Sequence, residues 1–270
     1  AICTLSSNNA ENSALLGRLG ACEAVIRALV KHMSVSGVAQ WACGAICNLS
    51  SNNAENRALL GRLGACEAVV RALREHMSAS VVAQRACGVI WSLSSNNAEN
   101  SALLGRLGAC EAVVRALVEH MSAPSVAQLA CGAIYILSSN NAENRALLGR
   151  SGACEAVVRA LEEHMSVSSV VDQALAAIWN LANNNAENKI LLGRCGACEA
   201  VVQVLVEHRM VSGVAQRARA DIWNLSSSNA ENKALLGRLG ACEAVVRALV
   251  EHMSVSGVAE DACGAIRNLA

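Results

Sequence analysis

The hexapeptide GACEAV recurs six times, and successive copies begin 44 residues apart without insertion or deletion. The copies start at Gly20, Gly64, Gly108, Gly152, Gly196 and Gly240. A fixed period of this length is typical of solenoids, in which each repeat is a supersecondary unit that packs on its neighbours. We therefore expect one domain over residues 1–270. The tail of a preceding repeat occupies 1–7, and the repeats span 8–51, 52–95, 96–139, 140–183, 184–227 and 228–270.

Each repeat divides into three predicted helices. In the unit that starts at Asn52, Asn53 is a suitable N-cap for the first helix, and Gly64 ends that helix. The second helix places Val69 and Leu73 on its inner side, and the third begins after Ser78. Aromatic residues make up only 2% of a chain that is 53% hydrophobic, which favours helices packed through small side chains. The sequence thus predicts an all-α fold.

Comparison of the repeats separates two faces of the third helix. Val38, Ala42, Ile46 and Leu49 are the same in every complete repeat and lie at helical spacing, so they predict the core. Positions on the opposite arc vary, and three of the most varied are expected to be exposed. They hold Trp41, Arg85, Leu129, Gln173, Arg217 and Asp261; Cys47, Trp91, Tyr135, Trp179, Trp223 and Arg267; and Asn48, Ser92, Ile136, Asn180, Asn224 and Asn268. Gly or Ala at the Gly44 position leaves room beside them for a ligand.

The segments ENRALLGRLGACEAVVRAL and VAQWACGAICNLS resemble the armadillo repeat of beta-catenin and importin-alpha, and the likeness extends over essentially the whole chain. The resemblance implies a right-handed α-solenoid superhelix whose third helices line a concave groove. It also implies that a ladder of Asn side chains holds the backbone of an extended peptide. Asn48, Asn180, Asn224 and Asn268 match this ladder, whereas Thr4, Ser92 and Ile136 interrupt it.

The chain departs from the importin-type pattern one turn earlier, where that pattern has Trp. Here the equivalent residues are Gly44, Gly88, Gly132, Ala176, Ala220 and Gly264. Aromatic residues instead precede the ladder position, so a nuclear-import cargo is not the expected partner. The exposed aromatic residues indicate a binding surface, because Trp is enriched in binding hot spots. The alternative is that they pack between repeats.

Other site chemistries are not expected. The 22 basic and 22 acidic residues balance, which argues against nucleic acid and against a membrane partner. Equivalent His or Cys residues on stacked helices lie too far apart to share a zinc ion or a disulfide. The Cys22 and Cys43 series are predicted to fill the core, while Cys47 and Cys195 are candidate exposed thiols. We expect no catalytic residue, no metal and no cofactor.

The sequence therefore predicts a non-enzymatic module that holds an extended peptide or protein segment, in the cytoplasm or nucleus. The predicted binding residues are Trp41, Asn48, Arg85, Trp91, Tyr135, Trp179, Asn180, Arg217, Trp223, Asn224 and Asn268. Arg217 and Asp221 have the spacing of an ion pair on one helix. The alternative function is a structural scaffold, a head-to-tail homo-oligomer that stacks through repeat ends without polar caps. Recent duplication and consensus design both account for repeats this similar.

Overall fold

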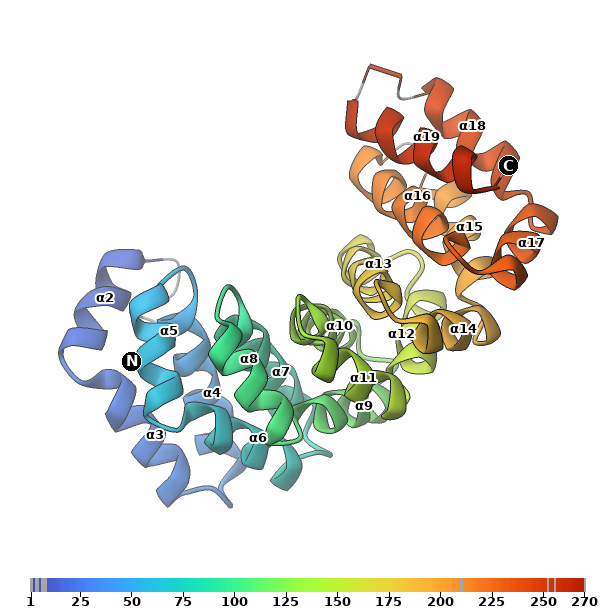
Figure 1. Cartoon of the computed structure of the whole chain (residues 1–270). Helices are drawn as coiled ribbons and strands as arrows, with labels where there is room; N and C mark the ends of the chain where they lie inside the picture. Colours follow the sequence, from blue (N-terminus) through green and yellow to red (C-terminus); the bar gives the residue numbers. More distant parts are fainter. Residues whose placement is uncertain are drawn as a thin grey trace. The chain divides into compact units, whose positions relative to one another are not determined.

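The computed structural model describes residues 9–208, 211–251, 253–254 and 256–269, together with Ile2 and Leu5. The expectations for Thr4, for His252 and for the end residues Ala1 and Ala270 lie outside the described residues. The chain consists of two compact units, Ala1–Leu147 and Leu148–Ala270, and the boundary between them falls within one helix. Every regular element in the described ranges is a helix (Figure 1).

The helices repeat in groups of three, as predicted. The first helices are α2 (Ala10–Arg18), α5 (Ala54–Arg62), α8 (Ala98–Arg106), α11 (Ala142–Arg150), α14 (Ala186–Arg194) and α17 (Ala230–Arg238). The second helices are α3 (Ala21–Lys31), α6 (Ala65–Glu75), α9 (Ala109–Glu119), α12 (Ala153–Glu163), α15 (Ala197–Glu207) and α18 (Ala241–Glu251). The third helices are α4 (Ser36–Ser50), α7 (Ser80–Ser94), α10 (Pro124–Ser138), α13 (Ser168–Ala182), α16 (Ser212–Ser226) and α19 (Ser256–Leu269).

The predicted helix boundaries are confirmed, and each has a local cause. Asn53 Oδ1 accepts a hydrogen bond of 2.9 Å from the backbone N–H of Asn56, which satisfies one of the free donors at the start of α5. Gly64 separates α5 from α6 with a φ of 85°, a left-handed conformation that glycine adopts at little cost. Pro124 occupies the first turn of α10, where its missing N–H is not needed.

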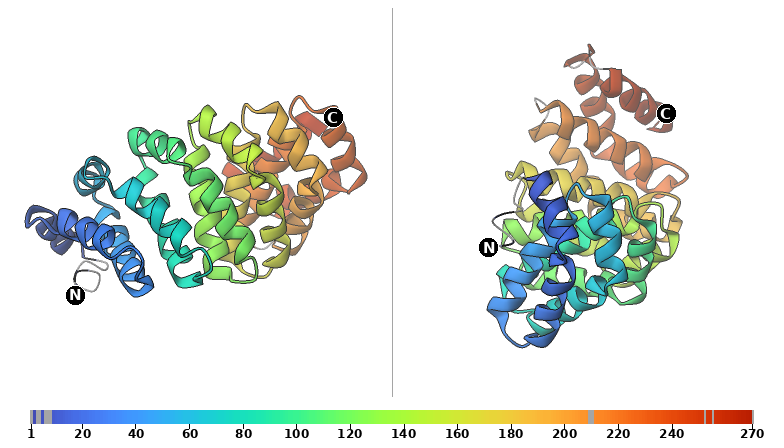
Figure 2. Two further views of the ribbon diagram at one scale, coloured as in Figure 1. Left: turned by 90° about the horizontal axis from the view of Figure 1, so that it is seen from below. Right: turned by 90° about the vertical axis from the view of Figure 1, so that its left-hand side faces the viewer.

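The third helices form the core of each unit. In the first unit α7 packs between α4 and α10, and in the second unit α16 packs between α13 and α19. Figure 2 shows the helices of each unit stacked in chain order. Ala42, Ile46 and Leu49 are buried, as are their equivalents as far as Leu225, so the predicted core stripe is confirmed at these positions. Val38 and, in the last repeat, Ile266 and Leu269 are half-buried. The exposed carboxylates of Glu55, Glu67 and Glu75 lie outside this core.

Successive repeats are joined by a buried Asn side chain that sequence comparison did not single out. Asn56 Nδ2 donates to the carbonyl oxygens of Ser13 and Leu49 at 2.9 and 3.0 Å. The same two bonds recur from Asn100, Asn144 and Asn232. A Cβ atom added to Gly61 would overlap the Asn100 carboxamide, so the first helix needs glycine where the next repeat approaches. These bonds fix the spacing of the stack.

Repeated His and Cys residues contribute to the packing of the helices. His76 Nε2 lies 2.7 Å from the Met33 carbonyl oxygen of the preceding repeat and must donate, because the carbonyl only accepts. Burial raises the pKa of Cys43, Cys87 and Cys131 to about 12, which keeps these thiols protonated. The prediction of core cysteines is confirmed for them but is wrong in the last repeat, where Cys242 and Cys263 are exposed. Cys47 and Cys195 are half-buried rather than fully exposed.

Candidate functional site

A cleft of about 320 Å³ opens in the first unit around Trp91. We call it the Trp91 cleft. The side chains that define it are Ser51, Arg57, Arg85, Trp91, Ser92 and Ser95. They come from the third helix α7, from the end of the preceding third helix and from the first helix α5. The cleft brings together two of the predicted binding residues, Arg85 and Trp91, and both are half-buried.

A second cleft, of about 560 Å³, lies in the second unit between α13 and α16. We call it the double-Trp cleft. Its defining residues are Trp179, Asn183, Lys189, Trp223, Asn224 and Ser227. The two indole rings meet edge to face, with centroids 6.4 Å apart and planes at 63°, which is a favourable aromatic geometry. Three predicted binding residues, Trp179, Trp223 and Asn224, therefore share one cleft.

The small residues at the Gly44 position accommodate the chain's own tryptophans. A Cβ atom added to Gly132 would overlap the ring of Trp91, and one added to Gly264 would lie 3.0 Å from the ring of Trp223. The expectation that this position leaves room for a ligand is thus wrong at these two residues, because the preceding repeat's indole fills the space. The half-buried tryptophans both pack between repeats and line the clefts.

Two of the predicted Asn ladder residues, Asn224 and Asn268, use their side-chain Nδ2 groups in hydrogen bonds within the protein. Asn224 Nδ2 donates to the Trp179 carbonyl oxygen at 2.9 Å, and Asn268 Nδ2 donates to the Trp223 carbonyl oxygen at 3.1 Å. Each bond joins a ladder residue to the tryptophan of the preceding repeat, and Asn180 is buried in α13. These two ladder residues therefore hold their third helices to the backbone of the preceding third helix.

The expected ion pair between Arg217 and Asp221 does not form. Arg217 Nε lies 2.6 Å from Asp172 Oδ1, so Arg217 joins α16 to α13 rather than to its own helix. Asp221 is buried, and neither of its carboxylate oxygens has a hydrogen-bond partner. The prediction fails because the side chain at position 221 faces the packed interior, whereas Arg217 is exposed.

Comparison with solved structures relates this architecture to designed proteins. An engineered protein has 27% sequence identity and a TM-score of 0.80, and the match covers 92% of this chain and 98% of that chain. A designed armadillo repeat protein in complex with the peptide (KR)4 has 25% identity and a TM-score of 0.78, with 92% and 99% covered. The chain has an armadillo-like repeat fold.

A third structure, of computationally designed armadillo repeat proteins for modular peptide recognition, agrees with this armadillo-like assignment. It has 25% identity and a TM-score of 0.79, and the match covers 91% of this chain and 98% of that chain. No family profile and no curated protein matches the sequence.

Two cleft residues of the armadillo-like repeats were missed by sequence reasoning, Arg57 and Lys189. Both belong to first helices, and they occupy one repeat position, which holds Ser13, Arg57, Ser101, Arg145, Lys189 and Lys233. Variation between Ser and a cation at this position was a usable signal. It was overlooked because the comparison of repeats was confined to the third helix.

Arg57 and Lys189 are largely buried, although burial is unfavourable for a charged side chain. Arg57 is 8% exposed, and its Nη2 donates to the Ser50 carbonyl oxygen at 3.2 Å. Lys189 is 9% exposed, and its Nζ donates to the Ser227 carbonyl oxygen at 2.8 Å. Burial lowers the pKa of both side chains because the charged form loses hydration.

The remaining predicted binding residues lie apart from the clefts. Trp41 is 60% exposed and borders a nearly apolar hollow of about 630 Å³ with Val25, Val35 and Val38. Asn48 and Tyr135 are half-buried on α4 and α10, and neither lines a cleft described above. The structure therefore does not gather the predicted residues into one uniform set.

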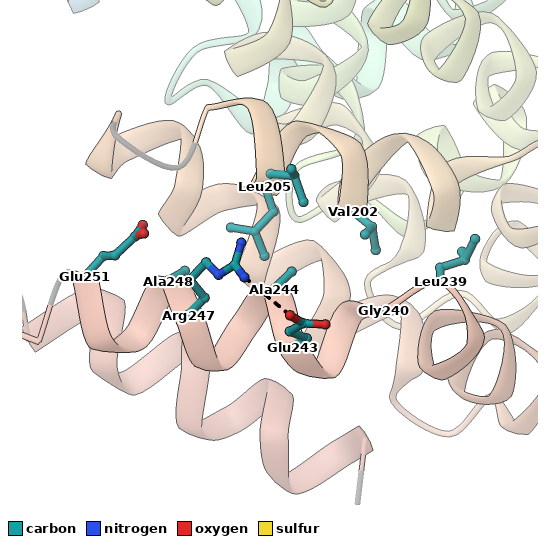
Figure 3. A pocket seen from close by; sticks show the side chains of 10 residues that line it. Val202, Leu205, Leu239, Gly240, Glu243, Ala244, Arg247, Ala248 and Glu251 are labelled. Carbon is teal, nitrogen blue, oxygen red and sulfur yellow. Dashed lines mark hydrogen bonds and ion pairs between the residues drawn. The ribbon is translucent and has the colours of Figure 1, made fainter.

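A further hollow lies on the second helices, between α15 and α18. It has a volume of about 240 Å³ and is lined by Val202, Leu205, Glu243, Arg247 and Glu251 (Figure 3). Arg247 Nη2 is paired with Glu243 Oε1 at 3.3 Å. Within the described ranges, no three His, Cys, Asp or Glu side chains gather as metal ligands, and no helix has the length and apolar character to cross a membrane.

Proposed function

We propose that the protein is a non-enzymatic peptide-binding module in which each unit binds an extended peptide segment, the first unit at the Trp91 cleft and the second at the double-Trp cleft. The observation that carries the proposal is the edge-to-face pair of Trp179 and Trp223 beside a polar wall that includes Asn183 and Ser227. A half-buried aromatic surface with polar groups at its edge is typical of binding hot spots.

The form of the partner follows from the repeat geometry. An extended peptide advances about 3.3 Å per residue, and stacked helices lie about 8–10 Å apart. Two to three peptide residues therefore span one repeat, and side chains on one face of the peptide meet cleft residues of successive repeats. Two designed armadillo repeat proteins with this fold, one in complex with a peptide and one designed for modular peptide recognition, support a peptide as the ligand.

Selection from a random library of linear peptides tests this function. Peptides that the protein enriches are titrated by calorimetry against the unmodified chain and against Trp91→Ala, Trp179→Ala and Trp223→Ala. Loss of a hot-spot indole is expected to cost about 2 kcal/mol, or roughly 30-fold in Kd. Trp41→Gln is the matched control, because Gln173 occupies the equivalent position and Trp41 lines neither cleft. Enriched peptides that bind all four variants equally would refute the proposal.

The apolar hollow beside Trp41 favours a second candidate function, head-to-tail self-assembly. Its lining is almost entirely apolar, and a Trp that is 60% exposed is costly in water. Sedimentation over a range of concentrations tests this candidate. Assembly through the hollow predicts a larger species that dissociates in Trp41→Gln, whereas a monomer at every concentration contradicts it.

A further inference from the structure

We infer that the peptide segment bound by each unit is acidic, and that the cleft of that unit receives a carboxylate side chain next to an indole ring. The inference rests on the proposed function and names the chemistry of its ligand. It starts from the charges of the cleft walls. Arg57 and Arg85 line the Trp91 cleft, Lys189 lines the double-Trp cleft, and neither lining includes an Asp or a Glu.

The Trp91 cleft contains a guanidinium group that lacks part of its hydrogen bonding. Arg57 Nε is buried without a partner, while Nη2 donates to the Ser50 carbonyl oxygen. A buried polar group that lacks a partner is costly, and the cost is larger for a charged group. Arg145 has the same unpartnered Nε, so a ligand does not account for that atom; a carboxylate in the cleft can instead pair with Arg57 Nη1, which is not among the buried atoms and makes no hydrogen bond within the described residues.

The hydroxyl groups of this cleft do not replace the guanidinium groups as donors to a ligand. Ser51 Oγ donates to the Cys47 carbonyl oxygen at 2.7 Å, and Ser95 Oγ donates to the Trp91 carbonyl oxygen at 2.8 Å. Arg85 borders the same cleft and forms no ion pair with any residue that the structure describes. The charged donors left for a ligand are therefore those of Arg57 and Arg85, beside the neutral amide groups of Asn52 and Gln84.

The double-Trp cleft has the same character. Lys189 Nζ makes one hydrogen bond, to Ser227, although an ammonium group has three N–H donors. The other polar lining residues, such as Asn183 and Asn224, are neutral. A basic peptide side chain would here meet an ammonium group of like charge, whereas an acidic one would pair with it.

The acidic residues of the chain lie elsewhere, so the charge of the clefts is a local property of a neutral protein. Glu243 and Glu251 line the separate hollow on α15 and α18. Asp172 on α13 does not line the double-Trp cleft and is paired with Arg217. A cavity walled by one sign of charge attracts ligands of the opposite sign. This chain is thus expected to prefer the opposite charge to the (KR)4 peptide that accompanies one solved structure with its fold.

Two peptides of equal length and opposite charge test the inference. An eight-residue peptide of alternating Glu and Asp and one of alternating Lys and Arg, each with a fluorescent label, are titrated by anisotropy into the full chain. We expect tighter binding of the acidic peptide, and weaker binding as salt is added because the charges are screened. The double variant Arg57→Ser with Lys189→Ser should lose about tenfold or more of this affinity.

The chain supplies the controls. Ser13 and Ser101 occupy the position of Arg57 and Lys189, so repeats of this kind accept serine there. Arg106→Ser also removes one positive charge, but Arg106 is exposed at the end of α8 and lines neither cleft. Its affinity for the acidic peptide should stay within about twofold of the unmodified value. Arg85→Gln, which copies Gln173, is the second variant to measure if loss of Arg57 weakens the fold.

Tighter binding of the basic peptide would overturn the inference. So would a double variant, or Arg85→Gln in its place, that binds the acidic peptide like the unmodified chain. The inference of an acidic ligand can fail while the proposed peptide-binding function holds, and the two outcomes can be told apart. Library peptides that carry no acidic residue, yet lose affinity in the Trp variants, would refute the acidic ligand while supporting the peptide-binding module.

Discussion

At the scale of single residues, Arg219 and Asp221 in α16 are the least expected feature of the protein. Both are essentially fully buried, and all of their charged atoms lack hydrogen-bond partners. Other repeats hold Cys or Leu at the position of Arg219 and Ala or Val at that of Asp221. The substitution of charged for small apolar residues lowers stability, because buried charges lose hydration without recovering it in bonds.

Return to the common residues should stabilise the second unit. We expect the double variant Arg219→Cys with Asp221→Ala to raise the free energy of unfolding by about 1–4 kcal/mol. Chemical denaturation followed by circular dichroism measures the change. The matched control is Arg217→Gln, which copies Gln173 and alters an exposed, paired charge, so its effect should stay below about 1 kcal/mol. A double variant less stable than the original would show that the buried charges support the fold.

The loss of stability that Asp221 causes should increase as the pH rises. Burial raises the pKa of its carboxyl well above the ordinary value of 3.8, and Arg217 only partly opposes this. The folded state therefore binds the proton more tightly than the unfolded state, and the carboxyl group lowers stability increasingly as pH rises through the folded pKa. Unfolding of Asp221→Ala and of the original chain should differ most at neutral pH and least near about pH 4. A difference that grows as pH falls would contradict this sign.

At the scale of elements, Gly88 in α7 and Gly132 in α10 occupy the same position of the repeat, but replacement by Ala should change stability in opposite directions. A Cβ atom at Gly88 in α7 would make an ordinary contact of 3.5 Å with Leu129, whereas one at Gly132 in α10 would overlap the Trp91 ring. Gly88→Ala should stabilise the protein by about 0.5–1 kcal/mol through helix propensity. Gly132→Ala should destabilise it by about 1–3 kcal/mol through overpacking.

Melting temperatures of the two variants test this pair, and each serves as the control for the other. Fluorescence of the displaced indole provides a second measurement, because Trp91 should become more exposed in Gly132→Ala only. Equal shifts in melting temperature would show that the Trp91 ring does not rest on Gly132.

The sequence predicted the helices better than it predicted the site. Caps such as Asn53 and breaks such as Gly64 act locally, so their positions follow from neighbouring residues. The cleft cations Arg57 and Lys189 lie on first helices, and only the packing of three helices places them beside a tryptophan of a third helix. The partner of Arg217 was likewise unpredictable from one helix, because Asp172 belongs to the preceding repeat.

At the scale of the molecule, the strict period of 44 residues determines what can vary without loss of the fold. The buried Asn56 series and the His76 series repeat the same inter-repeat bonds, so they maintain the stack within each unit. Positions that make none of these inter-repeat bonds can differ from one repeat to the next without loss of the stack. The indole rings and cations of the clefts are such differences, and we propose that they bind the ligand.

NMR spectra of the four Trp indole N–H groups test whether the clefts bind the peptide. Signals are assigned by single substitution, and an enriched or acidic peptide is then added. Binding in the clefts predicts shifts for Trp91, Trp179 and Trp223, with Trp41 unchanged because it borders the separate apolar hollow. A bound peptide that moves only the Trp41 signal, or none of the four, would contradict the account.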